Sequence, residues 1–415
     1  MNTSKYSKLN SIKVRDVITV LMTIFFFAYY FIRTFQYFID EISWGIVMVV
    51  EFIYLIISMN WKENETKTIS CFIFLIIFLT IFECILQNKF NVKELLSLFN
   101  MLNNCFFPIY LFYNLNKVSI KAKKFILFIN IVVLCYVLVE TFTQLEINDS
   151  FMRRFDINYL NYHEFNIGNA GGYQFAYSMV MLACFCPNLF YEKLSFTTKL
   201  FSVISFVVCC ALVLSSSYSL ALLITFIVVF LVLIRRINNL LRRVCVSIIS
   251  FVIVLCIFIF SDYLVKLLPT ETMRVRFNEL FAFFKTGNLE GDNLIGRLNL
   301  YWNSVLAFLH SPFIGNASLS FDPHSSFFRF LAKDGIFGFT LYVVLHVMAY
   351  KTMYYMLPNK HRKALKYSFI ALILMGCVNP IHSAAACYYM VFTLIPLILD
   401  ILVKGENRNE TTLGS

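Results

Sequence analysis

The stretch GRLNLYWNSVLAFLHSPFIG (296–315) lies in the middle of the longest polar interval of the chain, residues 262–338. Two apolar runs border this interval, VCVSIISFVIVLCIFIFS (244–261) before it and KDGIFGFTLYVVLHVMAY (333–350) at its end. An apolar run of about 18 to 20 residues is long enough to cross a bilayer as a helix. The pattern therefore predicts membrane-spanning helices joined by one long polar connection, in which charge, glycine, proline and histidine collect.

Composition places the whole chain in the membrane class. Hydrophobic residues make up 59% and charged residues 14% of its 415 positions, and the mean hydropathy is +0.73, unlike a soluble domain. The net charge of +11 comes mostly from Lys and Arg between apolar runs, where the positive-inside rule accounts for it, so nucleic acid is excluded as a partner. Most of the twelve cysteines lie within apolar runs and none forms a Cys-x-x-Cys pair, which indicates packing rather than disulfides or metal binding.

Hydropathy predicts one all-α integral membrane domain, 1–415, with about twelve transmembrane helices. The predicted spans are 17–37, 42–59, 69–86, 95–114, 125–144, 169–190, 198–214, 218–234, 244–261, 333–350, 364–379 and 384–402. Lys and Arg are concentrated in alternate short connections, which places both termini in the cytoplasm and makes 403–415 a short cytoplasmic tail. The basic N-terminus runs into the first span without a small-residue cleavage site, so a retained span is expected rather than a signal peptide.

This topology makes residues 262–332 a large extracytoplasmic loop that contains two amphipathic helices. Within 270–285, apolar side chains recur at helical spacing, which predicts a helix on the membrane surface. A second helix is expected from about Leu294 to Leu309, because Pro312 stops it. Ser325 or Ser326 is the expected cap of the helix that follows.

Short motifs follow one another through this loop: Gly296-Arg297, Trp302, Pro312-Phe313-Ile314-Gly315, His324-Ser325 and, after nine further residues, Gly335-Ile336-Phe337-Gly338. Their order and spacing resemble the extracytoplasmic signature of the O-antigen ligase and polymerase superfamily. Members of that superfamily are membrane glycosyltransferases that use polyprenyl-diphosphate-linked sugars. The resemblance covers chiefly residues 290–340, and the first half of the chain is similar only in hydropathy.

The resemblance implies a bacterial cell-surface polysaccharide polymerase, for O-antigen, capsule or exopolysaccharide. Such a glycosyltransferase joins oligosaccharide repeat units carried on undecaprenyl diphosphate at the outer face of the plasma membrane, without a metal or other cofactor. Its implied partners are the lipid-linked oligosaccharide, membrane lipids, a chain-length regulator and a flippase. Two alternatives stay open: an O-antigen-type ligase of the same family, and a flippase or transporter of lipid-linked oligosaccharide, which twelve spans would also suit.

The chemistry of this reaction assigns roles to two residue types. A departing diphosphate needs cations, and arginine binds phosphate oxygens two at a time without losing its charge. The attacking hydroxyl needs a base, and histidine titrates near neutral pH. By its match to the family pattern, Arg297 is the expected diphosphate ligand and His324 the expected catalytic base. From the residues alone, a headgroup-binding arginine and a backbone-capping histidine remain alternatives.

The other motif residues have structural roles in this interpretation. Gly335 and Gly338 are expected to let the span approach its neighbours closely. The motif is completed by Gly296, Trp302, Pro312, Gly315 and Ser325. His382, at an outer turn, is a further candidate for chemistry.

The chain departs from the family pattern at Tyr218. Many members carry Ser-Arg at the outer start of a middle span, and the resemblance implies that this arginine is a second diphosphate ligand; here the pair reads Ser217-Tyr218. We expect another arginine to replace it, from the set Arg153, Arg154, Arg274 and Arg276. The pair at 153 and 154 is favoured, because its loop leads into the glycine-rich stretch 168–172.

Ionisable residues inside spans are functional candidates, because a charge in lipid is costly. Glu51 lies deepest, and its position alone leaves open a partner arginine, a cavity or a proton relay. Arg33 lies near the outer end of its span, where its side chain can reach the interface.

Overall fold

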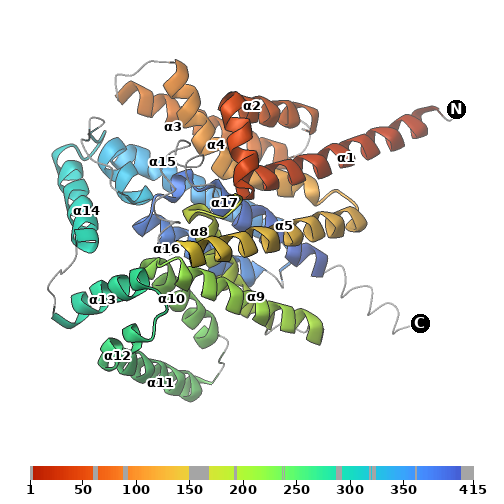
Figure 1. The fold of residues 1–415 in the computed structure, drawn as a ribbon. Coiled ribbons are helices and arrows are strands. Elements are labelled where there is room, and N and C mark those ends of the chain that lie inside the picture. The colour runs from red at the N-terminus through yellow and green to blue at the C-terminus, as the bar shows by residue number, and fades with distance from the viewer. Residues whose placement is uncertain are drawn as a thin grey trace.

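The computed structural model describes residues 3–58, 64–86, 92–148, 168–190, 194–235, 237, 239–286, 292–316, 319, 324–359 and 362–402. Within these ranges every regular element is a helix and none is a strand. The helices pack into one bundle, with α11 to α14 along one flank (Figure 1). Their bounds are α1 Thr3–Phe31, α2 Arg33–Ser58, α3 Asn64–Leu86, α4 Val92–Leu115, α5 Ile120–Ile147, α8 Tyr173–Phe190, α9 Phe196–Ser215, α10 Ser219–Arg235, α11 Leu240–Ile259, α12 Ser261–Lys266, α13 Glu271–Thr286, α14 Asp292–His310, α15 Ser326–Met356, α16 Arg362–Val378 and α17 Ala385–Tyr389.

The chain is an all-helical, multi-pass membrane protein. Each predicted span coincides with a helix or with consecutive helical segments. In the described part of the chain, six helices are long and apolar enough to cross a membrane: Val14–Phe31, Ile120–Ile147, Phe196–Ser215, Leu240–Ile259, Ser326–Met356 and Ala385–Leu402. α2 makes a seventh if its two parts, bent by 96°, form one span.

By length and apolarity, the described helices therefore support fewer membrane spans than the twelve predicted. The difference has local causes: α10 and α16 are short, with 17 residues each. α8 carries Pro187 and Asn188, and α4 carries Asn103, Asn104 and Pro108, which lower their hydropathy. Both helices are largely buried among other helices, where polar side chains can find protein partners instead of lipid.

The centre of the bundle is formed by α8 and the segment 385–402, most of whose residues are buried. That segment passes from α17 through a π-helical turn, Met390–Leu394, whose Thr393 hydroxyl donates to the Pro108 carbonyl at 2.7 Å. Pro108 lacks an N–H and leaves the Asn104 carbonyl without its helical donor. The Tyr30 hydroxyl of α1 donates to that carbonyl at 3.4 Å, so the hydrogen bond that is missing inside α4 is replaced by a contact with α1.

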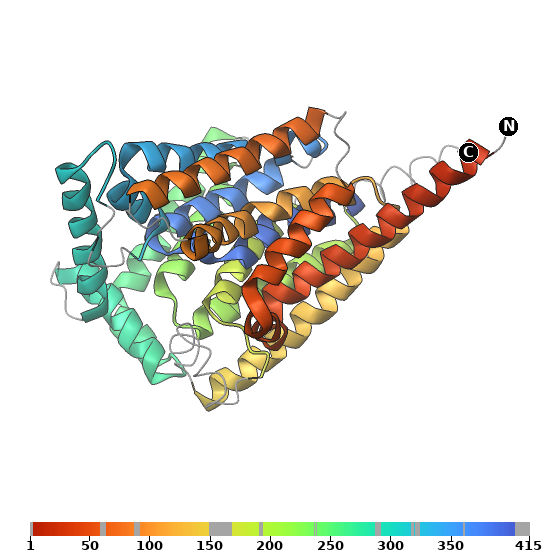
Figure 2. The ribbon, with the colours of Figure 1, turned by 90° about the horizontal axis from the view of Figure 1, so that it is seen from above.

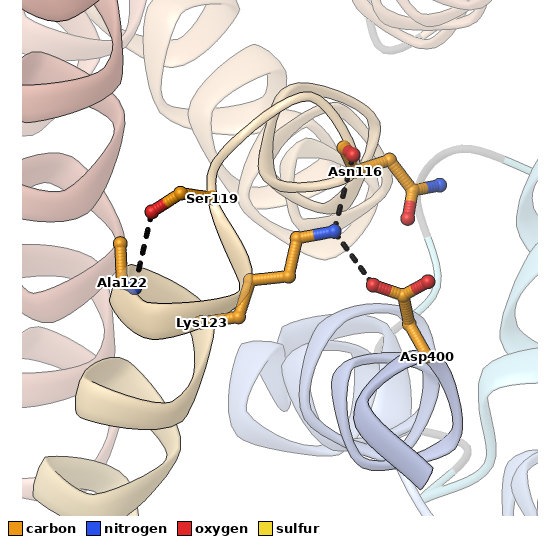
Figure 3. Close-up of polar contacts among 5 residues, drawn as sticks. All are labelled: Asn116, Ser119, Ala122, Lys123 and Asp400. Atoms are coloured by element: carbon orange, nitrogen blue, oxygen red, sulfur yellow. Dashed lines mark hydrogen bonds and ion pairs between the residues drawn. The ribbon is translucent and has the colours of Figure 1, made fainter. Parts of the chain in front are cut away.

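One buried ion pair joins the two halves of the chain (Figure 3). The Lys123 ammonium, fully buried in the first turn of α5, lies 2.6 Å from the Asp400 carboxylate near the end of the last helix. It also donates to the Asn116 carbonyl at 3.1 Å. The Ser119 hydroxyl accepts from Ala122 N–H and caps the start of α5, which fixes the turn that presents Lys123. Figure 2 shows α5 lying beside α1 along one edge of the bundle.

Candidate functional site

Helices α13 and α14, the two amphipathic helices expected between 262 and 332, lie across one end of the bundle (Figure 1). Together with the starts of α8 and α10 and the end of α16 they enclose a cleft of about 50 Å³, which we name the Arg297 cleft. It is lined by Tyr177, Tyr218, Ser219, Leu220, Ala221, Arg276, Glu279, Leu280, Arg297 and Asn379.

Arg297 enters this cleft from the first turns of α14. Its Nη1 donates to the Asn379 side-chain oxygen at 3.5 Å, and the Tyr177 hydroxyl donates to the same oxygen at 2.9 Å. One helical turn further along α14, the Tyr301 hydroxyl donates to the Val378 carbonyl at 2.8 Å. Burial raises the pKa of Tyr301, so this hydroxyl keeps its proton and remains a donor. These bonds dock α14 on the turn that follows α16.

Arg276 is a second cation on the same cleft. Its Nη1 lies 2.9 Å from Glu279 Oε2, one turn further along α13, and that ion pair is partly buried. Arg274, two positions earlier, is exposed and donates from Nε to the Leu268 carbonyl at 2.8 Å, away from the cleft lining. Arg153 and Arg154 lie outside the described residues.

Tyr218, which stands where the family pattern has an arginine, also lines the cleft. Its ring meets that of Tyr177 edge to face, with centroids 5.3 Å apart. The preceding residue, Ser217, has a φ of 58°, a left-handed conformation that is uncommon outside glycine. The structure thus brings Arg276 and Tyr218 to one cleft, although they come from different helices.

The two glycine motifs pack against each other through their backbones. Gly315 and Gly335 have φ values of 71° and 63°. A Cβ on Gly315 would lie 2.3 Å from the Lys333 carbonyl oxygen, and a Cβ on Gly335 would lie 2.5 Å from the Phe313 carbonyl oxygen. The Pro312 carbonyl accepts from Ile336 N–H at 2.8 Å and completes this contact. The approach requires glycine at both positions, and it coincides with a kink at Gly335, the non-helical residue inside α15.

The remaining motif residues differ in their surroundings. The position of a Cβ on Gly296 has no atom within 4 Å, and Trp302 is 62% exposed. A Cβ on Gly338 would lie 2.3 Å from the Asp334 Cβ, so Gly338 makes room for a buried carboxyl group. Ser325 is the N-cap of α15 and donates to the Cys377 carbonyl at 2.8 Å, which ties α15 to the end of α16.

Two histidines lie at the start of α15 in contrasting settings. His324 is exposed and has a φ of 50°, immediately before the Ser325 cap. His382 is buried, and its ring Nδ1 lies 3.0 Å from the Ser326 hydroxyl. The backbone N–H of His382 donates to the same hydroxyl at 2.9 Å. Burial lowers the pKa of His382 well below its usual range, and the charges of Arg329 and Lys333 lower it further. His382 is therefore neutral at neutral pH.

No family model and no characterised protein sequence matches this chain. Sequence reasoning missed Tyr177, Glu279 and Asn379 as members of the site. Of these three, only Asn379 could have been noticed in the sequence, because the pair Asn379-Pro380 separates two apolar runs. The other two positions acquire their place through packing between helices that are distant in sequence.

Proposed function

We propose that this protein is a polysaccharide polymerase of the bacterial plasma membrane. In this proposal it has twelve spans with both termini in the cytoplasm, and the Arg297 cleft faces outward. It would join oligosaccharide repeat units carried on polyprenyl diphosphate, and its partners would include a flippase and a chain-length regulator. The resemblance of the motifs between 296 and 338 to the O-antigen ligase and polymerase superfamily motivates this choice of reaction.

The observation that supports the proposal most is the meeting of Arg276 and Arg297 in one cleft beside Tyr218. A diphosphate that leaves a sugar carries off an electron pair and needs positive charge in place when it departs. Two guanidinium groups from different helices offer hydrogen bonds to phosphate oxygens, and with the Glu279 carboxylate that pairs with Arg276 they leave the lining with a net positive charge. In this role Arg276 replaces the cation that the family pattern carries at position 218.

The proposed reaction needs only groups of this chain. A sugar hydroxyl of the acceptor forms a bond to the anomeric carbon of the donor while the bond from that carbon to the diphosphate oxygen breaks. The electron pair leaves with the diphosphate, which Arg276 and Arg297 hold. The hydroxyl proton passes to a histidine, for which His324, at the exposed start of α15, is the proposed base.

The size of the cleft adds a condition. A cavity of about 50 Å³ holds a few water molecules at most, and a sugar diphosphate is much larger. Binding therefore requires α13 and α14 to move away from α10 and α16. The hydrogen bond from the Tyr301 hydroxyl to the Val378 carbonyl is one contact that such a movement would break.

The test uses the purified full chain in detergent with lipid-linked repeat extracted from its native host. A polymerase converts this substrate into a ladder of longer products, and Arg276→Gln and Arg297→Gln each lower the initial rate about 10- to 100-fold, the effect of losing one charge-assisted bond. Arg274→Gln is the matched control, because that arginine is exposed and lies outside the cleft lining, and it keeps the wild-type rate.

A second variant tests the replacement of the missing cation. In the double variant Tyr218→Arg, Arg276→Gln, the cation returns to the position of the family pattern. We expect the double variant to recover part of the rate that Arg276→Gln loses. If neither arginine affects the ladder, the proposed site is wrong. If wild-type protein forms no ladder in detergent but moves the lipid across a sealed membrane, the polymerase is replaced by a flippase.

A further inference from the structure

A second polar cleft opens on the same end of the bundle, and the function proposed above does not use it. It has a volume of about 180 Å³, larger than the Arg297 cleft, and we name it the Arg33 cleft. It is lined by Tyr30, Phe31, Arg33, Gln36, Tyr37, Gly171, Gly172, Tyr173, Gln174 and Phe175. The lining offers a guanidinium group, two side-chain amides and phenol hydroxyls, which together provide donors and acceptors for a carbohydrate and a cation for an anion.

The break between α1 and α2 forms one wall of this cleft. The sequence predicted a single span over 17–37, but α1 ends at Phe31 and Arg33 begins α2. Arg33 Nε donates to the Tyr37 hydroxyl at 3.0 Å, one turn further along α2. Both side chains are therefore held at the cleft.

The opposite wall is the glycine-rich start of α8, which the neighbouring helices hold in place. The Asn169 side-chain oxygen accepts from Thr34 N–H at 3.1 Å and also bonds the Thr34 hydroxyl. Gly171 N–H donates to the Thr141 hydroxyl at 2.8 Å. A Cβ on Gly171 would lie 2.3 Å from the Phe175 ring, so that ring occupies the space that a side chain at position 171 would need.

The first turns of α8 line both clefts, and the turn after α16, which lines the Arg297 cleft at Asn379, contacts Tyr173 of the Arg33 cleft. The Tyr173 hydroxyl lies 3.3 Å from the Ser383 hydroxyl, and the Tyr173 and Tyr177 rings meet edge to face at 5.6 Å. Tyr177 in turn lines the Arg297 cleft and donates to Asn379. Tyr173 and Tyr177, one turn apart on α8, thus stand between the two clefts.

We propose that the Arg33 cleft binds a second polyprenyl-diphosphate-linked sugar, the acceptor of the reaction. This inference rests on the proposed polymerase function, in which both substrates carry the same lipid diphosphate. The donor diphosphate gains negative charge when it departs, so we assign it to the cleft that holds both Arg276 and Arg297. The acceptor keeps its diphosphate bond and gains no charge there, so Arg33, the cation among the described residues that line this cleft, is sufficient, and Gln36 and Gln174 are placed to bind its sugar.

Native mass spectrometry of the purified full chain, with undecaprenyl diphosphate as the probe, tests the stoichiometry. Wild-type protein is expected to bind two probe molecules. Arg33→Gln weakens one site about 10- to 100-fold, Arg297→Gln weakens the other by a similar factor, and the double variant loses both. Arg33→Lys, which keeps the charge, is expected to retain part of the affinity, and exposed Arg274→Gln is expected to change neither site.

The inference is overturned if wild-type protein binds one probe molecule, or if Arg33→Gln still binds two with unchanged affinity. Displacement of the second molecule by an equal concentration of phosphatidylglycerol also overturns it, because the cleft would then be a general headgroup site. The thermal stability of each variant, measured alongside, separates lost binding from lost folding. Ladder formation by the wild type is scored independently, so two bound molecules without a ladder would reject the polymerase and leave the Arg33 cleft a diphosphate site.

Discussion

Removing one member of the Lys123–Asp400 pair should destabilise the fold more than any exposed substitution. The ammonium group has no exposed surface, and the carboxylate side chain keeps 10%. Removing one partner of a buried ion pair costs about 3–5 kcal/mol, because the other charge stays buried without its counterion. We expect Lys123→Met near the lower end of that range, since water can reach Asp400, and Asp400→Leu near the upper end.

Thermal unfolding in detergent measures this directly. The buried thiols of Cys184 and Cys209 become accessible to a thiol-reactive fluorophore as the bundle opens. At about 2 °C per kcal/mol for a large domain, the two substitutions should lower the Tm by roughly 6 and 10 °C.

The double variant decides whether the pair itself is the cause. Lys123→Met with Asp400→Leu replaces both charges by apolar groups of similar size, which is often neutral for a buried pair, so its Tm should return to within about 3 °C of wild type. Shifts below about 2 °C in both single variants would refute the reasoning, as would a double variant that loses the sum of the two shifts.

Three further outcomes are expected. Gly315→Ala and Gly335→Ala should each greatly reduce the amount of folded protein in membranes, because a Cβ would meet backbone atoms at 2.3 and 2.5 Å. Gly296→Ala should be neutral, because the space around its Cβ is open. Equal membrane abundance of all three variants would contradict the packing. His324→Ala should abolish long polymer in the native host at normal membrane abundance, and an unchanged ladder would remove His324 from the mechanism. The pKa of His382 in the folded state lies below its unfolded value of about 6.5, so the unfolded state binds more protons and stability falls as the pH drops below 6.5. The difference in Tm between pH 7.5 and pH 5 should therefore be smaller in His382→Gln than in the wild type. An equal difference would exclude His382 as a source of the pH dependence.

The helical class and the approximate positions of most helices could be predicted from the sequence, because apolar length is a local property; the break between α1 and α2 and the short helix α12 were not predicted. The boundaries moved where capping and packing decided them. α15 begins at Ser326, because Ser325 caps it and Phe327 packs against the core, and the non-helical residue Gly335 kinks it close to the predicted start of the span at 333. The number of membrane spans depends on which helices face lipid, and composition alone does not distinguish a helix buried in protein, such as α8, from one with no buried residue, such as α11.

The candidate site was only partly predictable for a related reason. Arg297 could be selected because its motif is local and resembles a family pattern. Arg276 shared the sequence evidence of Arg274 and of two other arginines, and only the docking of α13 beside α10 separates it from Arg274. Asn379 and Tyr177 carry no motif, yet they hold Arg297 in place.

The proposed assignment of donor and acceptor to the two clefts bears on the direction of chain growth. In the proposed reaction the diphosphate leaves from the cleft with Arg276 and Arg297, and the lengthened glycan remains on the carrier held by Arg33. The product must then reach the Arg297 cleft before it can act as the next donor, and the two rings in contact between the clefts are those of Tyr173 and Tyr177. Aromatic faces bind sugars without fixing them in one register, since stacking is less directional than hydrogen bonding. The polymer would therefore grow at the end attached to the lipid, because each new unit enters as the acceptor that keeps its diphosphate.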